Sequence, residues 1–126
     1  MSFLKNVKTR EDLEQEAKQS LVSRIAARRY EAEVCGIVAA GLTIATDDRS
    51  KLLINGAAVE AVLDPAYTMQ WKTPTGFVEL TGEQVIGVAR AVRAHVQACF
   101  DREAELLAAL DAGTLTAAML DEGWPE

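Results

Sequence analysis

The stretch "TGEQVIGVARAVRAHVQACFDREAELLAALDAG", residues 81–113, holds the longest regular pattern in the chain. Within it Val85, Val92, Cys99 and Leu106 recur every seven residues. Other apolar residues flank this series and widen it into a broad stripe along one side of a helix. The stretch therefore predicts one long amphipathic helix, against which the rest of the chain must be arranged.

The ends of this helix are marked by local signals. Thr81, with Gln84 three residues later, is the pattern of a capping box, and Gly113 is a typical stop. A helix from Gly82 to about Ala112 would be about 45 Å long, which exceeds the diameter of a small domain. We therefore expect that one subunit cannot cover the whole stripe and that the chain forms a homo-oligomer, a dimer or a trimer. The residues predicted at this oligomer interface are Val85, Val88, Val92, Val96, Cys99, Leu106 and Leu110.

The segment before the long helix, "YTMQWKTPTGFVELTG" at residues 67–82, alternates in the manner of a β-hairpin around the turn sequence "TPTG". Tyr67, Met69 and Trp71 share one face of the first strand, and Phe77 returns on the second strand. We expect these side chains to pack in the core against the helices. The alternative is that the aromatic face is a stacking platform for a ligand.

A second helix is predicted over residues 48–63, and Asp64-Pro65 ends it because the residue before proline avoids helical angles. The small residues Gly56 and Ala57 within it suggest that another backbone packs closely there. Its cap candidates are Thr46, Asp47 and Asp48.

The N-terminal part adds a first helix and a first hairpin. Residues 9–34 place apolar side chains four apart, with acids early and arginines late, and Thr9 is the expected N-cap. Residues 37–39 and 42–45 alternate around an Ala-Gly pair that suits a tight turn. The order helix, hairpin, helix, hairpin, long helix predicts an α+β protein with a small antiparallel sheet covered by helices. We expect a single domain over residues 1–126, with flexible ends at 1–8 and 121–126.

Charge and hydropathy exclude several classes of partner. The chain of 126 residues has a net charge of −6, and residues 51–126 carry five basic against eleven acidic residues. An acidic surface repels long nucleic acid, so no DNA or RNA partner is expected. No apolar run is long enough to span a bilayer, and the N-terminus lacks the apolar core of a signal peptide, so we expect a cytosolic chain without a membrane partner.

Residues with catalytic or metal-binding chemistry are few. The one histidine, His95, lies four residues before Cys99 without a third orienting group, which favours a histidine at the core edge or at an interface over a catalytic pair. Cys35 and Cys99 match no metal or redox spacing and are expected to be buried. The glycines form neither a phosphate loop nor a dinucleotide motif. We expect no catalytic residue, no metal, no cofactor and no enzymatic activity.

Arginines and aromatic residues offer one alternative site. A pocket for a small phosphate-bearing molecule would need convergent guanidinium groups and a stacking ring. The residues assigned to this ligand-binding alternative are Arg28, Arg29, Arg90, Arg93, Trp71 and Tyr67.

Three segments carry a resemblance to a known family: "RIAARRYEAEVCGI", "TDDRSKLLINGA" and "MQWKTPTGFVELTGEQVIGVARAVRAHVQACF". Over roughly residues 20–110 the chain resembles a family of domains of unknown function in tailed bacteriophages and prophages, often encoded beside tail-fibre or fibre-assembly genes. The resemblance implies a virion component or assembly protein that contacts a tail-fibre protein. It would be found in the host cytoplasm during assembly, or in the virion tail. The alternative is a phage counter-defence protein that sequesters a small nucleotide signal within an oligomer.

Overall fold

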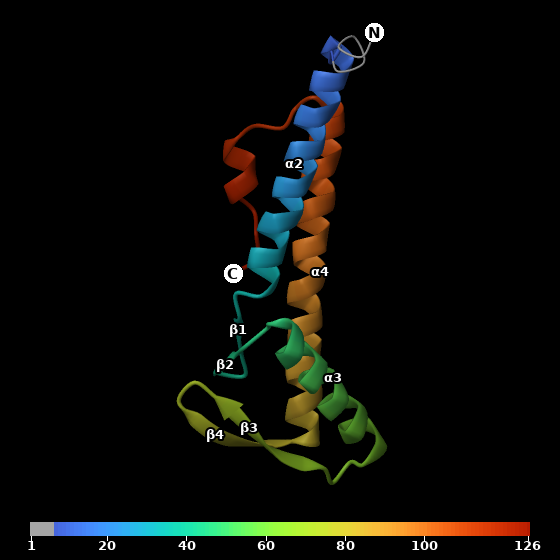
Figure 1. The fold of residues 1–126 in the computed structure, drawn as a ribbon. Coiled ribbons are helices and arrows are strands. Elements are labelled where there is room, and N and C mark those ends of the chain that lie inside the picture. Colours follow the sequence, from blue (N-terminus) through green and yellow to red (C-terminus); the bar gives the residue numbers. More distant parts are fainter. Residues whose placement is uncertain (1–6) are drawn as a thin grey trace.

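The structure is a computed structural model that describes residues 7–126. The first helix, α2 (Arg10–Glu33), starts at a capping box between Thr9 and Asp12, in which each backbone N–H donates to the other residue's side chain. Figure 1 shows α2 lying side by side with the upper half of the last helix, α4, and running in the opposite direction.

The long helix α4 (Gly82–Ala112) runs through almost the whole length of the molecule (Figure 1). Thr81 and Gln84 form the predicted capping box, with distances of 2.9 and 3.2 Å between donor and acceptor. Gly113 has a φ of 74°, a left-handed conformation that ends the helix. Both predicted helix ends are therefore confirmed.

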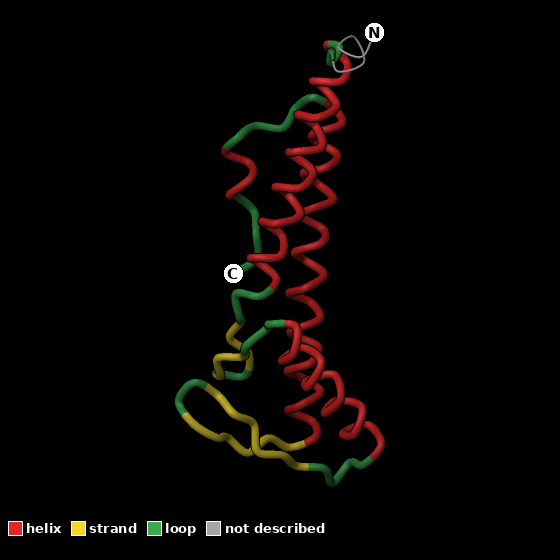
Figure 2. The backbone as a smooth tube through the Cα atoms, viewed as in Figure 1, coloured by secondary structure: helices red, strands yellow, loops and turns green. Residues whose placement is uncertain are grey.

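Two hairpins and a shorter helix lie against the lower half of α4 (Figure 2). The first turn places Ala40 and Gly41 at positive φ, as the sequence predicts. Each hairpin forms its own two-stranded antiparallel sheet, so the α+β class is confirmed with two small sheets in place of one. The elements are β1 (Ile37–Ala39), β2 (Leu42–Ile44), α3 (Asp48–Leu63), β3 (Thr68–Thr73) and β4 (Gly76–Thr81).

The hydrophobic core is divided along α4. Its lower part joins α3 and the hairpins to the first three turns of α4. The side chains buried there are Ile44, Ile54, Val88 and Val92 in one cluster and Ala57, Ala61, Leu80 and Val85 in the next. Its upper part joins Ile25 of α2 to Leu106 of α4 and to Leu120 of a short 3-10 turn, η1 (Ala118–Asp121).

The apolar stripe of α4 is largely covered within the chain, so most of the residues predicted at the oligomer interface are not accessible to a second copy. Helix α2 covers the upper half of the stripe, and α3 with the hairpins covers the lower half. Because these elements follow one another along α4, a single chain covers a helix longer than a small domain. The buried members are Val85, Val88, Val92, Cys99 and Leu106, while Val96 and Leu110 are half-buried against the core clusters.

The close backbone approach predicted at Gly56 occurs instead at Gly82. A Cβ atom on Gly56 would have no neighbour within 4 Å, whereas one on Gly82 would lie 3.3 Å from both Ala61 Cβ and Tyr67 O. The first residue of α4 therefore packs on the last turn of α3, which fixes the angle between the second hairpin and both helices.

The C-terminal residues fold back alongside α2 and contact both α2 and α4 (Figure 1). Arg102 donates to the carbonyl oxygens of Met119 and Glu122, at 3.1 and 2.9 Å. The indole of Trp124 donates to Leu120 O and lies under the Arg28 guanidinium. These contacts argue against the prediction of a flexible end at 121–126. Of the other predicted flexible end, residues 1–6 lie outside the described part of the chain.

Within residues 7–126, no helix has both the length and the apolar character that crossing a membrane requires.

Candidate functional site

A groove with a volume of about 680 Å³ lies between α3 and β3. Its α3 side is formed mainly by apolar residues, and its β3 side by consecutive residues of the strand. The lining residues are Ser50, Leu52, Leu53, Gly56, Ala57, Tyr67, Met69, Gln70, Trp71 and Lys72. We call it the α3–β3 groove.

The lining shows that the groove follows the edge of β3. Met69 and Trp71 point to one face of the hairpin and Gln70 and Lys72 to the other, yet all four line the groove. No residue of β4 does. The groove therefore lies along the edge of β3 that is turned away from β4, and no strand in the described part of the chain pairs with that edge.

The aromatic face of the second hairpin serves both the core and the groove. Trp71 packs against both lower core clusters, and Met69 packs against one of them, while both remain half-exposed in the groove. The prediction that Phe77 joins them in the core is wrong. Phe77 pairs with Lys72, which places it on the opposite face of the hairpin, and 67% of it is exposed.

The residues assigned to a nucleotide pocket are not brought together. Arg28 pairs with Asp121 at 3.6 Å and stacks on Trp124, so it lies against the C-terminal residues and does not line the α3–β3 groove. Arg29 points toward α4, where its guanidinium lies 4.5 Å from the ring centroid of Phe100. Tyr67 and Trp71 line the groove, and no arginine lines it with them.

Two further arginines, Arg90 and Arg93, are exposed on α4 and form no ion pair with any described residue. Arg93 lines a second, smaller groove of about 290 Å³ between α3 and α4, together with Lys51 and Asp48. This groove holds charges of both signs, and it lies on the other side of α3 from Tyr67 and Trp71. A stacking ring and convergent arginines therefore do not share one site.

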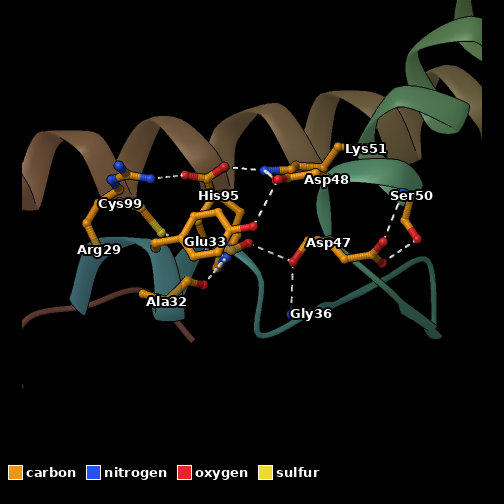
Figure 3. A network of polar contacts seen from close by, with 12 residues as sticks. Arg29, Ala32, Glu33, Gly36, Asp47, Asp48, Ser50, Lys51, His95 and Cys99 are labelled. Atoms are coloured by element: carbon orange, nitrogen blue, oxygen red, sulfur yellow. Dashed lines mark hydrogen bonds and ion pairs between the residues drawn. The ribbon is translucent and has the colours of Figure 1, made fainter. Parts of the chain in front are cut away.

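A buried charge cluster joins the three helices between the two parts of the core (Figure 3). Its centre is Glu33, which is only 7% exposed. Arg29 donates to Glu33 at 2.5 Å and to Glu103 of α4 at 3.2 Å, and Lys51 of α3 donates to the other Glu33 oxygen. Lys51 also pairs with Asp48 at 3.2 Å, so the cluster holds two cations against three carboxylates.

The carboxyl group of Glu33 stays ionised in this setting. Burial alone would raise its pKa, but the hydrogen bonds from Lys51 and Arg29 outweigh burial and lower the pKa below the usual value of 4.5. The pKa of Lys51 is raised for the matching reason, since its bonds to Glu33 and Asp48 outweigh its desolvation. The cluster is a network of ion pairs that links α2, α3 and α4, and sequence periodicity gave no sign of it.

His95 and Cys99 lie beside this cluster in the interior. The His95 Nε2 atom is 2.8 Å from the carbonyl oxygen of Ala32, and His95 is buried within the chain, which fits the core-edge alternative. Cys99 is fully buried, and burial raises the pKa of its thiol, which disfavours the reactive thiolate. The prediction that Cys35 is also buried is wrong: it follows the C-cap of α2 and is exposed.

A second buried polar contact closes the first hairpin onto α2. The Thr46 hydroxyl donates to Glu33 O at 2.7 Å and accepts from Gly36 N–H at 2.9 Å, while Asp47 caps α3. Thr46 is therefore an internal brace rather than a cap. No group of three or more potential metal ligands lies together in residues 7–126.

Sequence reasoning expected the β3 residues Tyr67, Met69 and Trp71 in the core, with a ligand platform as the alternative, and it missed the α3 side of the groove. Residues 48–63 contain apolar residues at nearly every angle around the helix, including Leu52, Leu53 and Val59. A helix that is apolar all round is normally enclosed on all sides. In the structure one face of α3 packs on α4 and another face is open. The apolar residues all round this helix are therefore the signal that could have identified it as a binding element.

Comparisons with known proteins identify one family. No curated protein and no solved structure matches the chain. The model of the family described as "Domain of unknown function (DUF4376)" matches residues 16–122, which begin within α2, extend past the end of η1 and include the α3–β3 groove. Since the match covers most of the sequence, the chain belongs to the DUF4376 family.

Proposed function

We propose that this chain is a non-enzymatic protein-binding domain of a phage or prophage, and that it binds an extended segment of a partner protein in the α3–β3 groove. The partner is a tail-fibre protein, and the domain acts in fibre assembly or as a small component of the tail. The single observation that carries the proposal is the groove itself, which joins an apolar helix face to an unpaired strand edge.

The groove suits an added strand. An unpaired strand edge offers backbone N–H and C=O groups to an extended peptide, and neighbouring pockets select alternate side chains of that peptide. Here the pocket beside the edge is lined by Leu53, Ala57, Met69 and Trp71. A partner segment with alternating apolar residues would bury them while its backbone pairs with β3.

The proposal that the chain is not an enzyme rests on the surroundings of its two most reactive side chains, His95 and Cys99. The imidazole of His95 is held by a backbone carbonyl, and the Cys99 thiol is buried at a raised pKa. Replacing His95 with Gln and Cys99 with Ala should therefore leave partner binding intact, with only a loss of stability. The tail-fibre assignment comes from the family resemblance in the three sequence segments quoted above.

The proposal is tested by co-expressing the chain with the fibre protein encoded at the same locus and purifying the complex. Tyr67→Ala and Lys72→Glu alter the groove without touching a fully buried side chain. Each should reduce recovery of the fibre about tenfold, as expected when a central contact of a binding surface is lost. The control is Phe77→Ala on β4, which does not line the groove and should leave recovery unchanged.

Two results would contradict the proposal. One is fibre recovery that is equal for the groove variants and for the wild-type chain. The other is calorimetry that shows submicromolar binding of a cyclic di- or trinucleotide, lost in Arg90→Ala/Arg93→Ala, which would favour nucleotide sequestration.

A further inference from the structure

Helix α3 carries a second apolar stripe that faces away from the core. Leu52, Gly56, Val59 and Leu63 follow the spacing of four, three and four residues that places side chains on one face of a helix. The three large side chains of this outer stripe are 72%, 60% and 74% exposed. The opposite face of the same helix, with Ile54 and Ala61, is buried on α4.

We propose that the outer stripe of α3 is a homodimer interface, in which α3 of one copy crosses α3 of a second copy in antiparallel orientation at Gly56. This inference goes beyond the proposed function, because it concerns the outer stripe and a second copy rather than the groove and a fibre protein. Leu52 and Gly56 form the border between the two surfaces.

Gly56 lies near the middle of the outer stripe and allows a close crossing. A Cβ atom on this residue would have no neighbour within 4 Å, so the space over it is open. The distance between two packed helices depends on the side chains at the contact, and a glycine there lets the axes approach to the short end of the range of about 8–10 Å. Leu52 and Val59, one turn to either side, then pack against the second helix.

The charges that border the stripe are complementary under two-fold symmetry. At about 100° per residue, Arg49 and Glu60 lie on the same flank of α3, within about 40° of Gly56. Neither forms an ion pair with a described residue of its own chain. A two-fold axis at Gly56, perpendicular to the plane of the two helices, leaves this flank on the same side of both helices and reverses the direction of the second helix. Arg49 of one copy then lies about one helical turn from Glu60 of the other.

This charge arrangement selects a second copy as the occupant. The contact occurs twice, and each copy supplies one cation and one anion to it. A parallel arrangement would instead bring Arg49 to the height of the other Arg49 and Glu60 to the height of the other Glu60, so no cation would lie level with an anion. The face is only one helix long, about 24 Å, so the dimer belongs to the small interfaces and we expect micromolar dissociation.

The experiment is sedimentation equilibrium of the full chain between about 1 and 300 µM, the range in which a small interface assembles. We expect a reversible monomer–dimer equilibrium. Leu52→Glu and Val59→Glu should each raise the dissociation constant at least about tenfold, because they bury a charge in an apolar contact. The matched control is Val38→Glu on β1, which is as exposed as the stripe and distant from it, and it should leave the constant unchanged.

Charge reversal tests the antiparallel register. Arg49→Glu and Glu60→Arg should each weaken self-association, since each creates two contacts between like charges. An equimolar mixture of the two variants should restore it, because the mixed dimer contains two contacts between opposite charges. Circular dichroism of each variant reports whether the helices remain folded.

The proposal is overturned by a 13.6 kDa monomer at every concentration. It is also overturned if the dimer of folded chains responds to Val38→Glu rather than to Leu52→Glu, or if the mixture associates no better than its components. Loss of fibre recovery in the groove variants with an unchanged monomer–dimer equilibrium would leave this interface standing and support the proposed function separately.

Discussion

The stripe of α4 and the outer stripe of α3 consist of the same kinds of residue at the same helical spacing, but only one of them is covered. Leu106 of α4 is fully buried under α2 and η1, while Leu63 of α3 is 74% exposed. The longer stripe led us to predict an oligomer interface on α4, and the shorter stripe passed unnoticed. The difference teaches that the length of an apolar stripe does not reveal which elements of the same chain will cover it.

The largest expected difference between the two stripes is in stability. Leu106→Ala should cost about 3–5 kcal/mol of unfolding free energy, because it leaves a cavity in the upper core. Leu63→Ala should cost less than about 0.5 kcal/mol in the single chain, since the side chain lies in water. Urea unfolding followed by circular dichroism, at a concentration where the chain is monomeric, measures both. Similar losses of unfolding free energy at the two positions would contradict the conclusion that only the stripe of α4 is covered.

The second hairpin gives the same contrast on two faces of one strand pair. Trp71→Ala should cost about 3 kcal/mol, the lower end of the range for a large aromatic, because Trp71 contacts both lower core clusters but is only half-buried. Phe77→Ala, on the exposed face, should change stability by less than about 0.5 kcal/mol. Thermal unfolding of both variants decides the matter, and a costly Phe77→Ala would mean that its face is covered.

Replacing Glu33, the central carboxylate of the charge cluster, tests how much this cluster stabilises the fold between the two parts of the core. Glu33→Gln leaves Arg29 and Lys51 with less negative charge, and should cost about 2 kcal/mol, less than for a fully buried pair because both cations reach water. Urea unfolding at pH 7 measures this cost. A neutral or stabilising effect would show that desolvation already cancels the attraction within the cluster.

The pH dependence of the cluster has a definite sign. The pKa of Glu33 is lower in the folded than in the unfolded chain, so its contribution to stability is fully present above about pH 4.5 and is lost as the pH falls through the folded-state value. Unfolding free energy measured from pH 7 down to pH 3 should therefore fall less steeply in Glu33→Gln than in the wild-type chain. If unfolding free energy fell equally steeply with pH in both chains, Glu33 would not contribute to the loss of stability in acid.

The smallest expected effect concerns the two capping boxes. Thr81→Ala removes the cap at the start of α4, where the first residue packs on α3, and should cost about 1 kcal/mol. Thr9→Ala removes the same contact from the exposed start of α2 and should cost less, because that end can fray without opening the core. Thermal unfolding compares them, and an equal loss would show that the start of α2 is as firmly held as that of α4.

The sequence by itself determined the elements of this protein and most of their ends. Capping boxes at Thr9 and Thr81, the left-handed stop at Gly113 and the Ala40-Gly41 turn act over a few residues, so they can be identified without knowledge of distant contacts. Periodicity likewise identified the second hairpin and the shared face of Met69 and Trp71, because alternation along a strand is a local property.

Only the tertiary structure decided which apolar surface is covered and which polar groups meet. The placement of α2 and α3 end to end along α4 buries its stripe and leaves Leu52 and Leu63 in water. The cluster around Glu33 joins Arg29, Lys51 and Glu103 from three helices, and the hairpin register turns Phe77 outward beside Lys72. These outcomes depend on contacts between residues distant in sequence, because burial is set by the whole arrangement of helices and not by the pattern of any one of them.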